Sequence, residues 1–191
     1  DDMEVFKDIK IIREYTNLKI DLHIISPSPQ RFYEEVIANK IEILTIQIEG
    51  VDALEKPDGF NGSYGIGVMT ETGISEYQLD GVDHVLFMAT VPGQSGGKYN
   101  TNTFSKIRNF KASYPDTRIL VDGGVDAEIS FILKSIGVDH VVSGSYLMKS
   151  ENKLESFYNM TNEKHVNVEY FMTPCDSVGA IRDNEVELIV I

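Results

Sequence analysis

Residues 118–125 read Arg-Ile-Leu-Val-Asp-Gly-Gly-Val, an apolar run that ends in an aspartate and two glycines. The run is short and rich in branched side chains, which is typical of a strand buried on both faces of a parallel sheet. Glycines directly after a strand let backbone N–H groups approach an anion closely, and a following helix start adds a favourable dipole. The stretch therefore predicts a parallel strand over Arg118–Asp122 with a polar site at its carboxyl end.

Similar runs recur along the whole chain. The other apolar runs are Lys19–Ile25, Ile43–Ile48, Tyr64–Met69, His84–Ala89, Asp139–Ser143, Asn167–Met172 and Glu185–Ile191. Segments with helical spacing lie between most of them, with one face at Val5, Ile9 and Ile12 and another at Phe32, Val36 and Ile37. Alternating strands and helices predict an α/β fold, and eight strands predict a (β/α)8 TIM barrel of parallel strands. We expect residues 1–191 to form this barrel as a single domain.

The composition narrows the classes of partner. The 191 residues carry 30 acidic and 17 basic side chains, a formal net charge of −13, which disfavours nonspecific binding to nucleic acid or anionic membranes. The single cysteine, Cys175, excludes an intrachain disulfide. No apolar run reaches the roughly 18 residues that a membrane span needs, and the acidic residues 1–4 lack the basic start of a signal peptide. We therefore expect a cytoplasmic protein without nucleic-acid or membrane partners.

Glycines gather after three of the predicted strands. They lie in Val91–Tyr99, in Asp122-Gly123-Gly124 and in Ser143-Gly144-Ser145. Three such loops at the same end of successive parallel strands would converge on one anion, whereas each loop alone also fits a tight turn. A P-loop is excluded, because only three residues separate Gly93 from Gly97 and no serine or threonine follows Lys98.

Two polar residues end predicted strands. His23 lies near the end of the first strand and Asp122 ends the fifth. A histidine and a carboxylate at the carboxyl ends of strands can share a metal ion or move protons. Either residue alone also fits a hydrogen-bonded polar group at a barrel mouth. His84 and His140 precede strands, at the end that serves stability, and we interpret both as structural.

These residues together resemble the ribulose-phosphate 3-epimerase family of phosphate-binding TIM barrels. The resemblance rests on Asp21-Leu22-His23-Ile24-Ile25-Ser26, on residues 87–97, on Val121–Val125 and on Ser143-Gly144-Ser145. Their order and spacing agree with the family from about residue 3 to residue 160. The resemblance implies metal-dependent 3-epimerisation of a ketose phosphate, of the type that converts ribulose 5-phosphate to xylulose 5-phosphate in the pentose phosphate pathway.

The resemblance also implies roles for single residues. His23 and Asp122 become metal ligands, and Asp122 becomes one of two catalytic acid/base carboxylates. Asp1 or Asp2 is the candidate for the second carboxylate, with Asp2 taken as the site residue, and Met88 would line the substrate pocket. The implied phosphate-binding residues are Gly96, Gly97, Gly123, Gly124, Gly144 and Ser145. The implied cofactor is a divalent metal ion (Zn, Fe, Mn or Co), and we expect a homo-oligomer.

The chain departs from the family in its metal strand and in its tail. No strand ending in His-x-Asp is found, and Gln47 stands where the family usually has a histidine. The tail reads strand (168–172), short helix (176–183) and strand (186–191), the shape of the family's first two strands. A circular permutation would place Ile191 beside Asp1, since permutation is tolerated where termini are adjacent. The alternative is a truncated or rearranged chain.

The departures keep a second function open. A non-catalytic sugar-phosphate-binding member of the same family would retain the glycine loops and lose part of the metal site. An aldolase or decarboxylase would need a lysine inside the barrel, and neither Lys19 nor Lys98 is well placed for that. The enzyme is therefore the first hypothesis and the binding protein its alternative.

Overall fold

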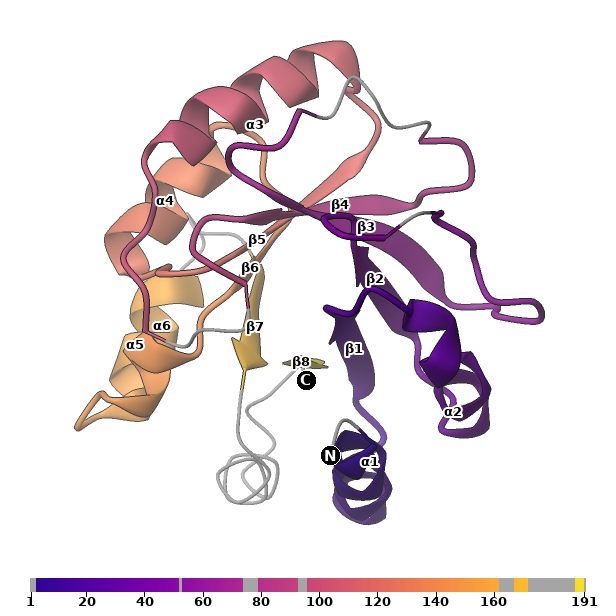
Figure 1. The fold of residues 1–191 in the computed structure, drawn as a ribbon. Helices are drawn as coiled ribbons and strands as arrows, with labels where there is room; N and C mark the ends of the chain where they lie inside the picture. Colours follow the sequence, from indigo (N-terminus) through magenta and orange to yellow (C-terminus); the bar gives the residue numbers. More distant parts are fainter. Residues whose placement is uncertain are drawn as a thin grey trace.

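The computed structural model describes residues 3–51, 53–73, 79–92, 96–161, 167–171 and 188–190. Its centre is a parallel sheet that curls into a half-barrel (Figure 1). The strands are β1 (Lys19–Ile24), β2 (Ile43–Gln47), β3 (Ser63–Met69), β4 (His84–Met88), β5 (Arg118–Asp122) and β6 (His140–Val142). Each pairs in parallel with the next. The predicted α/β class with parallel strands is confirmed.

The tail adds two short stretches of strand backbone. β7 (Asn167–Phe171) pairs in parallel with β6, and β8 (Leu188–Val190) pairs in parallel with β7 and β1. The predicted runs 167–172 and 185–191 also include residues 172, 185–187 and 191, which lie outside the described residues. The predicted helix at 176–183 and the predicted meeting of Ile191 with Asp1 lie outside the described residues.

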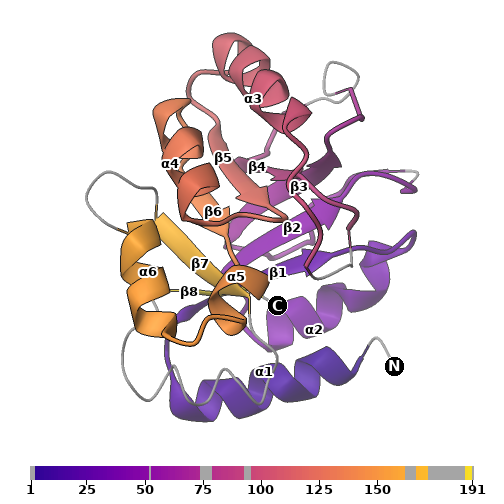
Figure 2. The same ribbon diagram turned by 90° about the vertical axis from the view of Figure 1, so that its left-hand side faces the viewer.

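Helices lie along the convex side of the sheet (Figures 1 and 2). They are α1 (Glu4–Tyr15), η1 (Pro29–Phe32), α2 (Tyr33–Ala38), α3 (Asn102–Ser113), α4 (Ala127–Ser135), α5 (Ser145–Met148) and α6 (Lys153–Thr161). Within the described residues, the connections after β2 and β3 contain no helix. This arrangement leaves the concave side and the carboxyl ends of the strands to loops.

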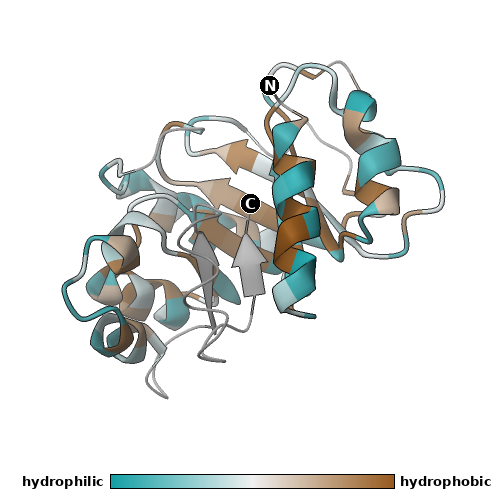
Figure 3. Ribbon diagram, turned by 90° about the horizontal axis from the view of Figure 1, so that it is seen from below, coloured by the Kyte–Doolittle hydropathy of each residue, from teal (hydrophilic) through white to brown (hydrophobic). Residues whose placement is uncertain are grey.

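The two faces of the strands differ in chemistry because side chains alternate along a strand. Ile20, Leu22 and Ile24 of β1 belong to the main core, which also contains the buried face of α1. A separate small cluster of Leu86, Met88 and Leu120 lies on the other face of the sheet. In Figure 3 the coloured strands are mostly brown, whereas the helices mix brown and teal. The apolar layer between sheet and helices therefore stabilises the scaffold, whereas the concave face combines this small apolar cluster with polar side chains such as Thr45 and Gln47.

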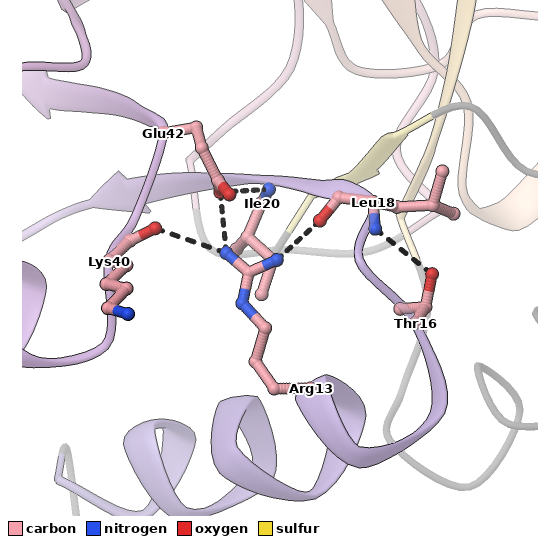
Figure 4. A network of polar contacts seen from close by, with 6 residues as sticks. All are labelled: Arg13, Thr16, Leu18, Ile20, Lys40 and Glu42. Atoms are coloured by element: carbon pink, nitrogen blue, oxygen red, sulfur yellow. Dashed lines mark hydrogen bonds and ion pairs between the residues drawn. The ribbon is translucent and has the colours of Figure 1, made fainter.

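An arginine fastens α1 to the first two strands (Figure 4). The Arg13 guanidinium donates to the Leu18 carbonyl (2.5 Å), to the Lys40 carbonyl (3.2 Å) and to Glu42 Oε2 (2.6 Å). Glu42 Oε2 also accepts from the Ile20 backbone N–H at 2.8 Å. This network lies at the amino ends of β1 and β2, away from the glycine loops.

Membrane insertion was not expected from the sequence. Within the residues that the structure describes, no helix combines the length and the apolar character needed to span a bilayer.

Candidate active site

The carboxyl ends of β3 and β4 border a cavity of about 260 Å³. Its lining residues are Met69, Thr70, Glu71, Met88, Ala89, Thr90, Val91, Gly97, Lys98 and Asn100. Met88 is paired in register with Asp122 of β5, and the Ala89 N–H donates to the Asp122 carbonyl at 2.7 Å. The predicted pocket residue Met88 and the predicted acid/base Asp122 therefore lie on neighbouring strands at the same level.

The glycine loop after β5 packs directly on the loop after β4. Gly123 (φ +108°) and Gly124 (φ +69°) both adopt left-handed backbone conformations that favour glycine. A Cβ on Gly123 would lie 2.8 Å from the Thr90 backbone nitrogen, and one on Gly124 only 2.5 Å from the Tyr99 backbone nitrogen and 2.9 Å from the Gly97 carbonyl oxygen. These contacts with backbone leave no room for a side chain, so both glycines are required by the packing of the two loops.

The loop after β4 also reaches the residues that follow β6. A Cβ on Gly96 (φ +83°) would lie 3.9 Å from the Ser145 Cβ and 3.2 Å from Lys149 Nζ. Gly144 is the N-cap of α5, and Ser145 is its first residue. All three predicted phosphate loops therefore meet at one end of the sheet. Phosphate binding by these residues stays a prediction, although the structure places them together.

His23 lies on the concave side of β1 in a chain of polar contacts. His23 Nε2 is 2.7 Å from Gln47 Oε1, and Gln47 Nε2 donates to Glu49 Oε2. Glu49 Oε1 accepts from the Met69 backbone N–H at 2.8 Å. A Cβ on Gly67 would lie 2.4 Å from Gln47 Oε1 and 2.8 Å from His23 Nε2, so the glycine makes room for this pair.

The bonding fixes the tautomer of His23. The Gln47 amide nitrogen faces Glu49, so its oxygen faces His23 and can only accept a hydrogen bond. The proton of the imidazole is therefore on Nε2. Burial lowers the pKa of His23 to about 4, against the smaller opposing effects of the Gln47 hydrogen bond and the Glu49 charge. At neutral pH the ring is uncharged, with its lone pair on Nδ1.

His84 illustrates a different arrangement at the amino end of β4. Its Nε2 lies 2.9 Å from Thr45 Oγ1 and its Nδ1 lies 3.0 Å from Ser63 Oγ. The Arg118 guanidinium donates to the same Ser63 hydroxyl at 2.7 Å. The side chain is buried, and burial is the main cause that lowers its pKa to about 4. His84 thus lies in a hydrogen-bonded structural position, at the end of the sheet opposite the glycine loops.

The predicted metal ligands do not form a complete site in the described part of the chain. His23 and Asp122 end strands that point to the same end of the sheet. His23 already uses Nε2 to bond Gln47, and among the described residues no group of three His, Cys, Asp or Glu side chains could hold a metal ion. A catalytic divalent ion usually takes three or more protein ligands. The described residues therefore do not fit the implied metal ion, and the proposed chemistry is derived without it.

The remaining predicted site residue, Asp2, lies outside the described residues. Two polar residues that the structure places at the site were absent from the predicted set. Glu49 lies two residues past the end of β2, so the rule that functional side chains follow parallel strands could have found it. Lys149 is four residues past Ser145, and only its contact with Gly96, across the fold, marks it.

Comparisons with known proteins identify the family to which the chain is similar. Residues 4–148 match the model of the ribulose-phosphate 3 epimerase family. A ribulose-phosphate 3-epimerase from Bacillus subtilis (strain 168) is 24% identical over 167 residues, which cover 82% of this chain and 77% of that protein. A protein of the same name from Helicobacter pylori (strain ATCC 700392 / 26695) is 28% identical over 161 residues, 79% of this chain and 74% of that protein.

The matched region extends from α1 to the end of α5 and so includes β1 to β6, His23, Asp122 and all three glycine loops. It covers well over half of the chain. The chain therefore belongs to the ribulose-phosphate 3-epimerase family, a family of isomerases.

Proposed function

We propose that this protein epimerises a ketose phosphate at C3, interconverting ribulose 5-phosphate and xylulose 5-phosphate. The observation that carries the proposal is the meeting of the three glycine loops beside the strand ends that hold Met88 and Asp122. Backbone N–H groups of glycine loops bind phosphate well without a basic surface. The acidic net charge of −13 is therefore compatible with an anionic substrate.

The proposed reaction is two proton transfers. The Asp122 carboxylate takes the proton from C3, next to the ketone, and the electron pair of the C–H bond moves into an enediolate. A second acid returns a proton to the opposite face of C3, which inverts that centre and restores the ketone. Asp2 is our candidate for the second acid. Such positioned proton transfers typically contribute about 10²–10⁴-fold to a rate.

We propose further that the sheet closes as a complete (β/α)8 barrel in a single domain with a permuted strand order. The parallel pairing of β8 with both β7 and β1 supports closure. The tail strands would then occupy the two places between β6 and β1, which in the family belong to its first two strands. The family match to residues 4–148, upstream of β7 and β8, supports the same assignment.

The names of the relatives favour an enzyme over the non-catalytic binding protein. The test is incubation of the purified protein with ribulose 5-phosphate in D₂O, followed by NMR. We expect xylulose 5-phosphate to form with deuterium at C3, because the proton taken by a carboxylate exchanges with solvent. Binding of ribulose 5-phosphate without turnover or exchange would refute the enzyme and support the binding protein.

A further inference from the structure

We propose that Lys149 supplies the positive charge that selects phosphorylated over unphosphorylated ketoses. The inference rests on the proposed function, since it places the phosphate among the three glycine loops. It adds a side chain to a site that the sequence assigned to backbone donors and one serine.

The position of Lys149 carries the inference. Its backbone N–H donates to the Ser145 carbonyl at 3.1 Å, so the residue closes the short helix α5. Its side chain then reaches the loop after β4, where Nζ lies 3.2 Å from the place of a Cβ on Gly96. The ammonium group therefore lies between two of the loops, beside the predicted phosphate binders Gly96 and Ser145.

The charge of Lys149 is available for a ligand. The ion pairs among the described residues join Lys10 with Glu35, Arg13 with Glu42 and Lys111 with Asp139, and they leave Lys149 unused. Lys149 is exposed, so its ammonium can meet a phosphate that arrives from solvent. In a chain with a net charge of −13, a local cation offsets the repulsion that a dianionic substrate meets on approach.

A second lysine near the cavity, Lys106, already has hydrogen-bond partners in the protein. Lys106 Nζ donates to the Met69 carbonyl and to the Thr72 carbonyl (2.5 Å), and it lies 5.5 Å from the centre of the Phe87 ring. Its charge therefore holds the loop after β3 against α3. Lys98 lines the cavity beside Gly97, next to the strand ends that hold the reacting groups. Lys149 differs from both because it lies between Gly96 and the start of α5.

The experiment compares Lys149→Gln with Lys149→Arg and with a matched control, Lys134→Gln. Lys134 is an exposed lysine in the last turn of α4, which runs from the carboxyl end of β5 to the amino end of β6. Both glutamine variants remove one positive charge, but only the first removes it from the glycine loops. Calorimetry with inorganic phosphate and kinetics with ribulose 5-phosphate are measured at two ionic strengths.

We expect Lys149→Gln to weaken phosphate binding and raise KM roughly tenfold with kcat little changed, because a charge-assisted hydrogen bond at an exposed site is lost. The salt dependence of phosphate binding should fall as well. Lys149→Arg should keep most of the affinity, and Lys134→Gln should behave like the unchanged protein. Unaltered phosphate affinity in Lys149→Gln would overturn the inference, as would equal losses in the glutamine and arginine variants.

The two proposals fail in different ways. If the unchanged protein binds phosphate through Lys149 but does not turn over ribulose 5-phosphate, the inference stands and the proposed function falls. If it turns over the sugar and Lys149→Gln keeps the original KM, the function stands and the inference falls.

Discussion

The two ends of the concave face each hold a histidine, and the two are bonded differently. At the amino end, both ring nitrogens of His84 have hydroxyl partners, Thr45 and Ser63. At the carboxyl end, His23 uses Nε2 for Gln47, and Nδ1 has no hydrogen-bond partner among the described residues. Burial lowers both pKa values to about 4. A shifted pKa therefore does not distinguish the two histidines, whereas the bonding of the second ring nitrogen does.

Strand β3 accommodates both histidines with glycines. A Cβ on Gly65 would lie 2.1 Å from His84 Nε2, and one on Gly67 would lie 2.8 Å from His23 Nε2. Since the glycines are two residues apart, both face the concave side. Glycine thus makes room for the buried His84 at one end of the strand and for the polar residues of the proposed site at the other.

The largest effect is expected from Asp122→Asn at the carboxyl end. Loss of the acid/base carboxylate should lower kcat by about 10²–10⁴-fold, with phosphate binding retained because the glycine loops do not depend on the carboxylate. Asp139→Asn is the matched control at the amino end, where Asp139 accepts from the Ile119 N–H at 2.8 Å. It should cost some stability and leave kcat unchanged. Full turnover by Asp122→Asn would contradict the assignment of the acid/base role.

The two glycines of β3 offer a paired test. Gly65→Ala forces a methyl group into the buried ring of His84, which should cost about 3 kcal/mol of stability, at the upper end for overpacking. Gly67→Ala displaces the partly buried His23–Gln47 pair nearer the cavity and should cost less stability but more activity. Urea denaturation and kcat/KM of both variants check this. Equal stability losses with equal activities would mean that the two ends of the face do not differ in function.

Burial of His84 should make the folded chain less stable at acid pH. Its pKa of about 4 in the folded chain lies below the ordinary value of 6.5, so between these pH values the unfolded chain binds more protons. Stability therefore falls as pH drops through this window, by about 2 kcal/mol from His84 alone between pH 7 and pH 5. His84→Gln should be less stable at pH 7 but show a shallower loss toward pH 5. An unchanged pH slope in that variant would show that His84 is not the group that titrates.

The sequence predicted the first six strands closely because parallel strands buried on both faces read as continuous apolar runs. The strand at 118–122 was predicted to the residue, and that at 43–48 ends one residue earlier in the structure. Helical faces were harder to predict. Phe32, Val36 and Ile37 were predicted to share one face, and Phe32 and Val36 are buried, but Ile37 is 40% exposed because it lies about 100° around α2 from its neighbour Val36.

The site was predictable only as far as position along the chain determines it. Gly123, Gly124 and Ser145 were predicted to lie at one end of the sheet because each follows a strand, and parallel strands end on one side. The His23–Gln47 bond joins residues 24 apart, and the Gly96–Lys149 contact crosses the fold. Such pairs depend on strand register and loop packing, which apolar periodicity does not encode. The structure was therefore needed to find Lys149, whereas Glu49 could have been found from its position after a strand.

The smallest effect is expected from Arg13→Met. This variant removes the guanidinium hydrogen bonds that join α1 to the amino ends of β1 and β2, and it keeps much of the side chain's length. The Arg13–Glu42 pair is partly exposed, so the variant should lose about 1 kcal/mol. Glu42 keeps its bond from the Ile20 N–H, and the Leu18 and Lys40 carbonyls can turn to water. Because the Arg13 hydrogen bonds lie at the amino end, kcat and phosphate affinity should stay unchanged while the urea midpoint falls slightly. A drop in kcat at unchanged stability would show that α1 affects the carboxyl end of the sheet. It would contradict the idea that the amino end contributes to stability and not to activity.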